Sequence, residues 1–311
     1  MQHKKAEPLA SLPAFGNSDG FIIVAVLWML GSLSALLSVY AVFVVNTAPG
    51  FLVHDYRLRA DTLVSAAVEL TAYRQLNTPA QSRQRSGQFN FKLDRANATV
   101  EFRSETSRID LNAASKPLLT GLFVALGARG GDAELYSDRI IAWRTAPQTA
   151  RIAGPWPPRL GRMLREDKFP HAYELSLVPD IPPGLIERAL PFVTVYSGRP
   201  QVNILDAAPE VIAALPAMTW DRVHAVLAQR QLAPDNIQFL NSLLGPAQQF
   251  TTIEGSRALR VNVAVALDGG YRATTESVIL LFEEGSEPYS VLSWHNASSQ
   301  AFHEPSRKIV R

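Results

Sequence analysis

The sequence predicts an α+β fold in which a long N-terminal α-helix and an antiparallel sheet are interrupted by a large inserted α-helical domain. Three observations lead to this prediction. An uncharged apolar run begins at Phe21, alternating apolar and polar residues form two separate blocks of strands, and residues 109–252 between the blocks have helical patterning. One sheet divided by an insert explains the two strand blocks more simply than two sheets do.

The composition allows two modest domains and excludes several kinds of site. The chain has 311 residues, a formal net charge of +2 and no cysteine. A chain without cysteine has no disulfide framework, no thiolate zinc site and no cysteine nucleophile. The basic residues are not gathered into a run, so the charge pattern does not indicate a polyanionic partner.

The apolar run from Phe21 to Val45 has the length of a membrane span. It holds 25 residues without a charge, which as a helix extend about 37 Å, against about 30 Å for a hydrocarbon core. A buried core helix and a cleavable secretory signal are the alternatives, but the run is too long for a signal and no A-x-A site follows it. The basic residues 3–5 precede the run, which predicts a single span with a cytoplasmic N-terminus and an exported remainder.

A second helical pattern follows the span. Pro49 and Gly50 are expected to kink or interrupt the helix. Beyond them, apolar residues recur at steps of three and four, which predicts an amphipathic helix that packs on its own sheet. The residues of this stripe are Val53, Tyr56, Ala60, Leu63, Ala67 and Leu70.

Alternating patterns predict two strands before the helical insert and two after it. Turn-forming residues separate the two strands of each pair, at 94–97 and again at 268–270. The predicted strands centre on residues 89–93, 100–102, 259–267 and 277–282.

These patterns divide the chain into six segments. The two sheet-containing segments flank the insert and form one module, and the polar C-terminus is expected to be a disordered tail. The segments are a leader (1–20), a transmembrane helix (21–48), the first part of the sheet module (49–108), the helical insert (109–252), the C-terminal strands (253–290) and the tail (291–311).

The insert contains an internal repeat at residues 108–144 and 201–230. Each copy has an apolar residue, Asp or Asn, a pair of alanines, a Leu-rich helix, a turn, Asp-Arg and a second helix that ends in Arg. Ser115 with Pro117 fits a capped helix start in the first copy, as does Ala208 with Pro209 in the second. The pattern resembles a helix-hairpin-helix, a unit that holds the DNA backbone through glycine amides of its turn.

Nucleic-acid binding is nevertheless not the favoured role of this repeat. The second copy has residues 215–218 (LPAM) where glycine is needed, and the first has Gly127, Gly130 and Gly131 in a longer turn. Neither copy has clustered Lys or Arg, so counterion release would contribute little to binding. We expect a structural role and no nucleic-acid partner, with a membrane-tethered DNA receptor as the alternative function.

The junction of leader and apolar run resembles the class III leader of type IV pilins and pseudopilins. A polar leader ends at Gly20, and Phe21 begins the long apolar helix. In that family a prepilin peptidase cuts after the Gly, and the new N-terminal Phe is methylated. The resemblance therefore implies cleavage between Gly20 and Phe21, and N-methylation of Phe21.

The fifth residue after the expected cut departs from the usual family pattern. Most members have Glu there, and this sequence has Ala25. A Glu in a bilayer is costly and is kept only where it pairs, in pilins with the terminal amine of the neighbouring subunit. In the secretion family the member that lacks this Glu is the K component, which is expected at the tip.

Further motifs resemble the K-type minor pseudopilin of type II secretion. Each motif alone would be weak, and the specificity lies in their order, over most of the chain from Gly20 to about Phe282. The matching segments are residues 110–113 (DLNA), 173–179 (YELSLVP), 191–197 (PFVTVYS) and 202–211 (VNILDAAPEV).

The resemblance implies a type IV pilin-like fold and a non-enzymatic assembly subunit. Such a subunit would help initiate and cap a pseudopilus from its tip and so assist protein export across the outer membrane. Ala25, Trp28 and Leu30 would lie on the assembly helix. The implied partners are the other minor pseudopilins, the prepilin peptidase and the inner-membrane assembly platform, and the implied location is the inner membrane with the bulk of the chain in the periplasm.

Residues for catalysis or metal binding are sparse in the sequence. The six histidines are scattered, and neither a nucleophile elbow nor a phosphate-binding loop is present. Family members can bind calcium, and the closest acidic cluster here is Asp132, Glu134 and Asp138. Its spacing matches no EF-hand loop, so calcium stays a possible cofactor without assigned ligands. A tethered periplasmic hydrolase is a third hypothesis, which would require a pocket with converging polar groups.

Overall fold

The structure, a computed structural model, describes residues 19–79, 82–94, 96–145, 168–268 and 270–300. The chain divides at Leu58 into two compact units, which are described separately. The first contains the beginning of helix α1 (Asp19–Leu76), and the second contains the end of α1, a sheet and the helical insert.

Helix α1 is continuous through Pro49 and Gly50. Of the two predicted outcomes, the interruption is therefore wrong, and the kink stays a prediction. A proline removes one hydrogen bond of the helical ladder, and here the ladder continues for several turns on both sides, which is enough to keep the segment helical.

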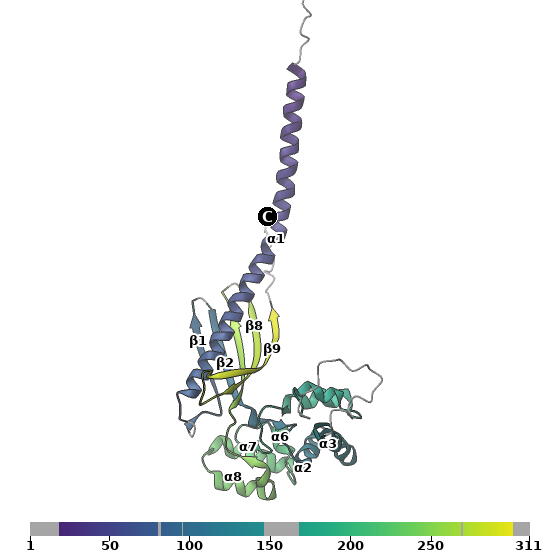
Figure 1. The fold of residues 1–311 in the computed structure, drawn as a ribbon, viewed down its shortest axis with the longest axis vertical. Coiled ribbons are helices and arrows are strands. Elements are labelled where there is room, and N and C mark those ends of the chain that lie inside the picture. Colours follow the sequence, from purple (N-terminus) through teal and green to yellow (C-terminus); the bar gives the residue numbers. More distant parts are fainter. Residues whose placement is uncertain (1–18, 80–81, 95, 146–167, 269, 301–311) are drawn as a thin grey trace, which may run out of the picture. The chain divides into compact units, whose positions relative to one another are not determined.

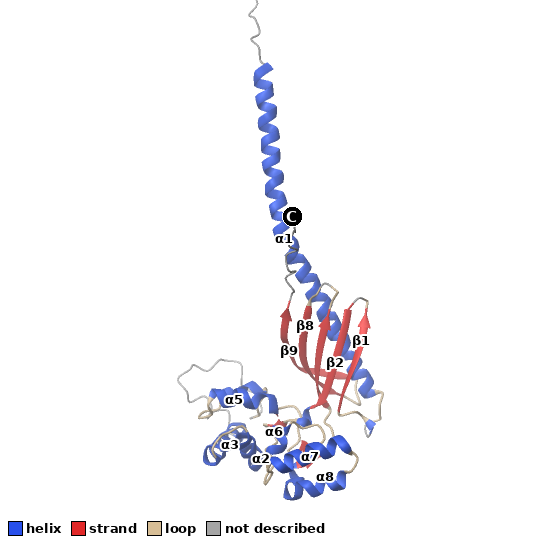
Figure 2. Cartoon of the chain, turned by 180° about the vertical axis from the view of Figure 1, so that it is seen from behind, coloured by secondary structure: helices blue, strands red, loops and turns tan. Residues whose placement is uncertain are grey.

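The second unit is built on a five-stranded antiparallel sheet, drawn as red arrows in Figure 2. The strand order is β1-β2-β7-β8-β9, so the two strands that flank the insert in sequence, β2 and β7, are neighbours in the sheet. The strands are β1 (Ser86–Leu93), β2 (Ala96–Ser104), β7 (Ala258–Ala266), β8 (Arg272–Leu281) and β9 (Tyr289–Gln300).

The four strands predicted from alternation are confirmed, and the sheet has a fifth strand, β9, that the sequence did not predict. The disordered tail predicted from residue 291 is wrong for residues 291–300, which pair with β8 along the edge of the sheet. The pairing contains register shifts at Thr274/Thr275 and Val278/Ile279, and these shifts help to explain why a simple alternation does not reveal the strand. Residues 301–311 lie outside the described residues.

The C-terminal part of α1 crosses one face of the sheet (Figures 1 and 2). Its buried stripe is close to the predicted one, with Ala60, Leu63 and Ala67 at most 3% exposed. Val64 and Val68 are also buried, and Tyr56 and Leu70 are only half-buried. The buried face of the helix is therefore rotated from the predicted one by about one residue. The side chain of Val53 lies outside the described part of the structure.

The insert leaves the sheet after β2 and returns at β7. Because Ser104 is paired with Leu259 in the register of these strands, both ends of the insert start from adjacent points of the sheet. A short 3₁₀ turn, η2 (Glu105–Ser107), leads from β2 into the insert.

The insert consists of two structural repeats that are longer than the sequence repeat. The first contains β3 (Ile109–Asp110), α2 (Lys116–Ala125), α3 (Gly130–Thr145), η3 (Ala172–Leu177), α5 (Pro183–Ala189), η4 (Leu190–Phe192) and β4 (Val193–Thr194). The second contains β5 (Val202–Asn203), α6 (Pro209–Ala213), α7 (Trp220–Leu232), α8 (Ile237–Leu244), η5 (Gly245–Phe250) and β6 (Thr251–Thr252).

Each repeat closes with a parallel strand pair, β3 with β4 and β5 with β6. These closing strands were missed by sequence reasoning. A signal for them exists, since residues 192–195 read FVTV and residues 250–253 read FTTI. Two-residue strands are too short for alternation to reveal.

The same polar contacts start both repeats. The Asp110 carboxylate accepts from the backbone N of Asn112 at 2.8 Å, and the Asn203 side-chain oxygen accepts from the backbone N of Leu205 at 2.9 Å. The arginine predicted to end each hairpin donates hydrogen bonds to backbone carbonyls at the start of the same repeat. Arg144 donates to the Leu111 carbonyl at 2.9 Å, and Arg230 donates to the Ala207 carbonyl at 2.6 Å.

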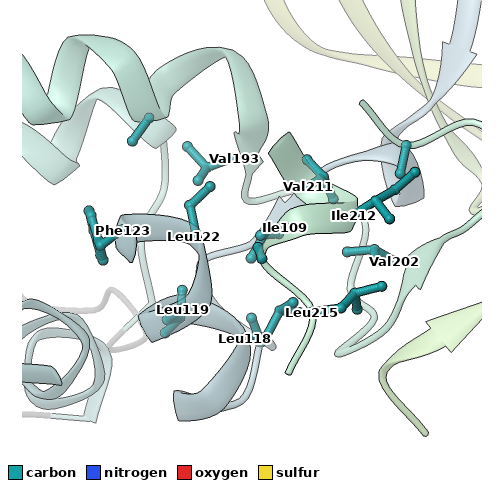
Figure 3. Packing of buried hydrophobic residues seen from close by; sticks show 14 of the residues in the cluster. Ile109, Leu118, Leu119, Leu122, Phe123, Val193, Val202, Val211, Ile212 and Leu215 are labelled. Atoms are coloured by element: carbon teal, nitrogen blue, oxygen red, sulfur yellow. The ribbon is translucent and has the colours of Figure 1, made fainter. Parts of the chain in front are cut away.

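The two repeats share one hydrophobic core, in which α2 and α6 pack together (Figure 3). Leu118, Leu119 and Leu122 of α2 are completely buried, as are Val211 and Ile212 of α6. The core joins the repeats into a single body. Its labelled members in Figure 3 also include Ile109, Phe123, Val193, Val202 and Leu215.

Candidate functional site

The predicted processing residues lie at the beginning of α1. Gly20 and Phe21 follow directly on Asp19, where the helix begins. The Phe21 side chain is 77% exposed. Cleavage and methylation at this point stay predictions, because no structural feature tests them.

The first unit exposes an apolar helix. Phe21–Val44 has a mean hydropathy of 2.4, and none of it is buried within the chain. The predicted assembly residues Ala25, Trp28 and Leu30 are all exposed. An exposed apolar surface of this length needs lipid or other protein around it.

The polar groups of this helix are compatible with an apolar environment. The Ser32 hydroxyl donates to the Met29 carbonyl and the Ser38 hydroxyl donates to the Ser34 carbonyl, both at 2.9 Å. These bonds satisfy the hydroxyl donors of Ser32 and Ser38 within the helix itself. The helix is therefore long and apolar enough to span a membrane.

In the second unit, a buried carboxylate joins the insert to the sheet. Glu105 of η2 is 1% exposed and accepts from Arg260 Nε of β7 at 2.8 Å and from Arg260 Nη2 at 3.1 Å. It also accepts from the Thr194 hydroxyl of β4, while Arg260 makes a further ion pair with Glu276 of β8. Burial acts to lower the pKa of Arg260, but the Glu105 and Glu276 carboxylates outweigh it and raise that pKa.

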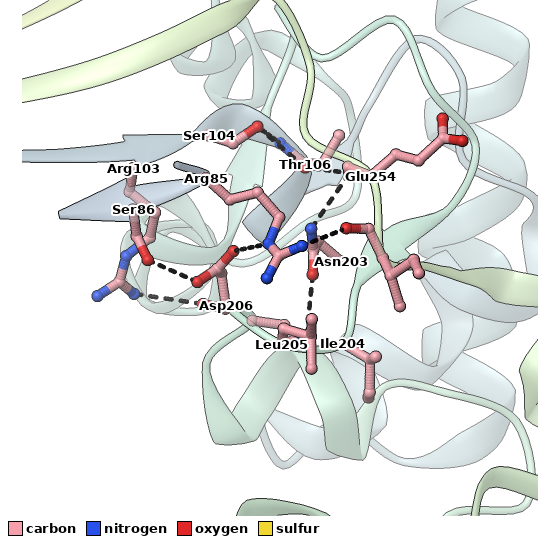
Figure 4. A network of polar contacts seen from close by, with 12 residues as sticks. Arg85, Ser86, Arg103, Ser104, Thr106, Asn203, Ile204, Leu205, Asp206 and Glu254 are labelled. Atoms are coloured by element: carbon pink, nitrogen blue, oxygen red, sulfur yellow. Dashed lines mark hydrogen bonds and ion pairs between the residues drawn. The ribbon is translucent and has the colours of Figure 1, made fainter. Parts of the chain in front are cut away.

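A second polar network joins the other repeat to β1 and β2 (Figure 4). The Asp206 carboxylate accepts from the Ser86 hydroxyl at 2.7 Å and lies 3.5 Å from Arg85 Nε. The Asn203 side chain and the Thr106 hydroxyl both donate to the Glu254 carbonyl, at 3.1 and 3.2 Å. Both repeats are thus tied to the sheet by buried or half-buried polar contacts.

The hairpin turn of the first repeat does not have the features of a phosphate site. Gly127 has φ +92° and ends α2, where its backbone N donates to the Val124 carbonyl and the next amide donates to the Phe123 carbonyl. The glycine therefore serves as a helix C-cap. The arginines that follow Asp in the two hairpins, Arg139 and Arg222, are engaged within the chain: Arg139 pairs with Asp180 at 2.8 Å, and Arg222 donates to the Ala217 carbonyl at 3.4 Å.

The acidic residues considered for calcium lie on α3. Asp138 pairs with Lys116 at 2.7 Å. In the described part of the chain, no group of three or more His, Asp or Glu side chains is arranged to hold a metal ion. The structure therefore assigns no ligand role to Asp132, Glu134 or Asp138.

Two of the scattered histidines come together in the fold. The rings of His171, before η3, and His295, in β9, have their centroids 5.4 Å apart. Tyr173 stacks on His171 at 5.1 Å, and Tyr196 meets His171 edge-on at 6.4 Å. Nothing in the sequence relates His171 to His295, because only the pairing of β9 with β8 brings His295 to this place.

The long helix, the antiparallel sheet and the inserted helical domain together define a type IV pilin-like α+β fold. Among solved structures, this chain is similar to a chain of the GspK–GspI–GspJ complex from the type 2 secretion system of enterotoxigenic Escherichia coli. The TM-score is 0.52 at 18% identity, and the match covers 79% of this chain and 98% of that chain. The chain therefore shares its pilin-like fold, with an inserted helical domain, with the matched chain. No protein-family model and no curated protein matches the sequence.

Proposed function

We propose that this chain is a minor pseudopilin of the K type, which helps initiate and cap a type II secretion pseudopilus from its tip. The main support for this proposal is the extent of the structural match, which covers nearly the whole of the matched chain and 79% of this one. Residues 109–252 make up nearly half of the sequence, so a match of that extent has to include much of the insert. In this role the chain assists protein export across the outer membrane and catalyses no reaction.

The exposed apolar helix gives the mechanism. It holds the subunit in the inner membrane, with the N-terminus in the cytoplasm and the second unit in the periplasm, and later packs among the helices of other subunits. The matched chain comes from a complex of GspK, GspI and GspJ, which supports other minor pseudopilins as partners. The inner-membrane assembly platform is the further proposed partner.

Two features support the tip position. Ala25 replaces the Glu that would need the terminal amine of a subunit ahead, so the chain does not require such a subunit. The helical insert adds a second layer of structure at one end of the sheet, and its bulk would obstruct a further subunit there.

N-terminal processing tests the proposal. The full chain is produced together with a prepilin peptidase, and the mature N-terminus is determined by mass spectrometry. We expect a start at Phe21, with a methylated amine, and no cleavage in a Gly20→Leu variant. An unprocessed Met1 terminus or a cut after Val45 would contradict the proposal.

A further inference from the structure

We propose that a pocket between the insert and the sheet binds a carboxylate side chain of an acidic peptide segment through Arg108. The pocket, called the aromatic pocket here, has a volume of about 640 Å³. Its aromatic lining consists of His171, Tyr173, Tyr196 and His295, and Arg108 and Arg260 also line it. Its volume lies within the range of about 300–1,000 Å³ that is usual for ligand pockets.

The two arginines of the aromatic pocket differ in their pairing. The charge of Arg260 is already paired, because Glu105 and Glu276 together accept from all three of its guanidinium nitrogens. Arg108 is half-buried, and among the described residues its guanidinium has neither a hydrogen bond nor an ion pair. Burial and the nearby Arg260 lower the pKa of Arg108, whereas Glu105 and Glu276 act in the opposite direction. The side chain stays ionised, since an arginine does not deprotonate in a protein.

An ionised, partly desolvated guanidinium offers donors to an incoming anion. Its planar fork matches a carboxylate in a bidentate geometry, and such charge-assisted bonds are about twice as strong as neutral ones. Arg108 and Pro191 also line a second cavity of about 590 Å³, so Arg108 borders two open spaces. An anion can therefore approach Arg108 without displacing a partner from the chain.

Other donors around the pocket suit a carboxylate as well. His171 Nδ1 accepts from the Tyr173 backbone N at 3.3 Å, which places the proton of the neutral ring on Nε2. Burial, followed by His295 and Arg260, lowers the pKa of His171, so this ring is a neutral donor at neutral pH. The Tyr173 side chain is 56% exposed and forms an accessible part of the lining.

The charges around the pocket favour a single negative charge. Glu187 and Glu276 also line it, and a doubly charged phosphate would be repelled by both. The aromatic rings and the apolar residues Leu190 and Pro191 provide surface for the stem of a side chain and for its neighbours. A peptide that carries Glu therefore fits better than a small free anion, which would leave most of the volume unfilled.

The test uses the full chain in detergent micelles and two small probes, acetyl-Phe-Glu amide and the isosteric acetyl-Phe-Gln amide. Binding is measured by ligand-observed NMR. We expect the Glu probe to bind about tenfold or more tightly than the Gln probe, because a charge-assisted pair is replaced by a neutral one. An Arg108→Gln variant should lose this difference, and Arg139→Gln, which alters a surface arginine outside the pocket, should keep it.

A folding control, a second variant and two competing anions complete the test of the proposal. Circular dichroism establishes that Arg108→Gln is folded. Tyr173→Ala changes an exposed residue and should leave the fold intact, and we expect it to weaken binding of the Glu probe severalfold. Sodium acetate and inorganic phosphate are added as competitors, and we expect neither to displace the peptide at equal concentration. Equal binding of the two probes, no binding at all, or full displacement by acetate or phosphate would overturn the proposal.

Discussion

Gly121 and Ala214 occupy equivalent places in the two repeats and lie against each other where α2 meets α6. A Cβ on Gly121 would lie only 1.9 Å from the carbonyl oxygen of Ala214. The obstacle is backbone, which cannot move aside as a flexible side chain can. The close approach of the two helices therefore depends on the absence of a side chain at residue 121.

We accordingly expect Gly121→Ala to destabilise the second unit by about 2–3 kcal/mol, because α2 and α6 have to separate. The matched control is Gly131→Ala in the first turn of α3, where an added Cβ meets nothing within 4 Å. That change should be neutral or should stabilise by about 0.5–1 kcal/mol through helix propensity. Urea denaturation followed by circular dichroism gives both values, and equal effects would show that the repeats are not packed as described.

At the scale of elements, one network connects η2, β4, β7 and β8. Glu105 and Arg260 are 155 residues apart, and their pairing is possible only because β2 and β7 are neighbours in the sheet. A buried ion pair adds little stability when both partners are present, but the loss of one partner is costly. The network therefore fixes the position of the insert on the sheet more than it contributes free energy.

Glu105→Gln is expected to lower the free energy of unfolding by about 3 kcal/mol, since it leaves a buried guanidinium short of one carboxylate. The control is Glu276→Gln, which removes a carboxylate that is 35% exposed. Its loss should be about 1 kcal/mol or less, as for a partly solvated ion pair. The two variants are compared by urea denaturation, and a larger loss for Glu276→Gln would contradict the role given to Glu105.

The sequence predicts some elements well and others not at all, for physical reasons. β7 is found because Leu259, Val261, Val263 and Val265 alternate with residues that point the other way. β9 is missed because its pairing with β8 includes irregularities, and β4 and β6 because two residues carry no period. The helical hairpins are found from apolar spacing and from proline in the first turn, which are local properties, although Ser115 at the start of α2 makes no side-chain capping bond.

The predicted Asp-Arg correspondence of the hairpins holds only in part. The arginines Arg144 and Arg230 make equivalent contacts, whereas Arg139 pairs with Asp180 and Arg222 bonds to its own turn. The longer first turn expected from the sequence is wrong, because residues 126–129 join α2 to α3 whereas residues 214–219 join α6 to α7. Asp138 and Arg139 instead lie in the middle of α3, and Asp221 and Arg222 lie in the first turn of α7. The site residues that depend on long-range pairing, Arg108 among them, could not be found from local patterns.

At the scale of the whole molecule, the proposed role depends on what lies ahead of the apolar helix in an assembled filament. Ala25 is exposed on that helix. In the pilins that the sequence resembles, the Glu at this position pairs with the terminal amine of the neighbouring subunit, so a carboxylate here is best stabilised where another subunit lies ahead. The substitution Ala25→Glu therefore distinguishes a tip subunit from an internal one.

For a subunit at the tip, we expect Ala25→Glu to reduce the initiation of pseudopili roughly tenfold. A charge at the centre of a span costs about 2.5–3.5 kcal/mol, and a site nearer its end costs less, about 1–2 kcal/mol. Ala25→Gln is the matched control, since it has the same shape without the charge and should reduce initiation much less. Initiation is counted in cells that produce the other minor pseudopilins with either variant. An internal subunit would give the opposite result, because the new Glu would pair with the amine of the subunit ahead and assembly would increase.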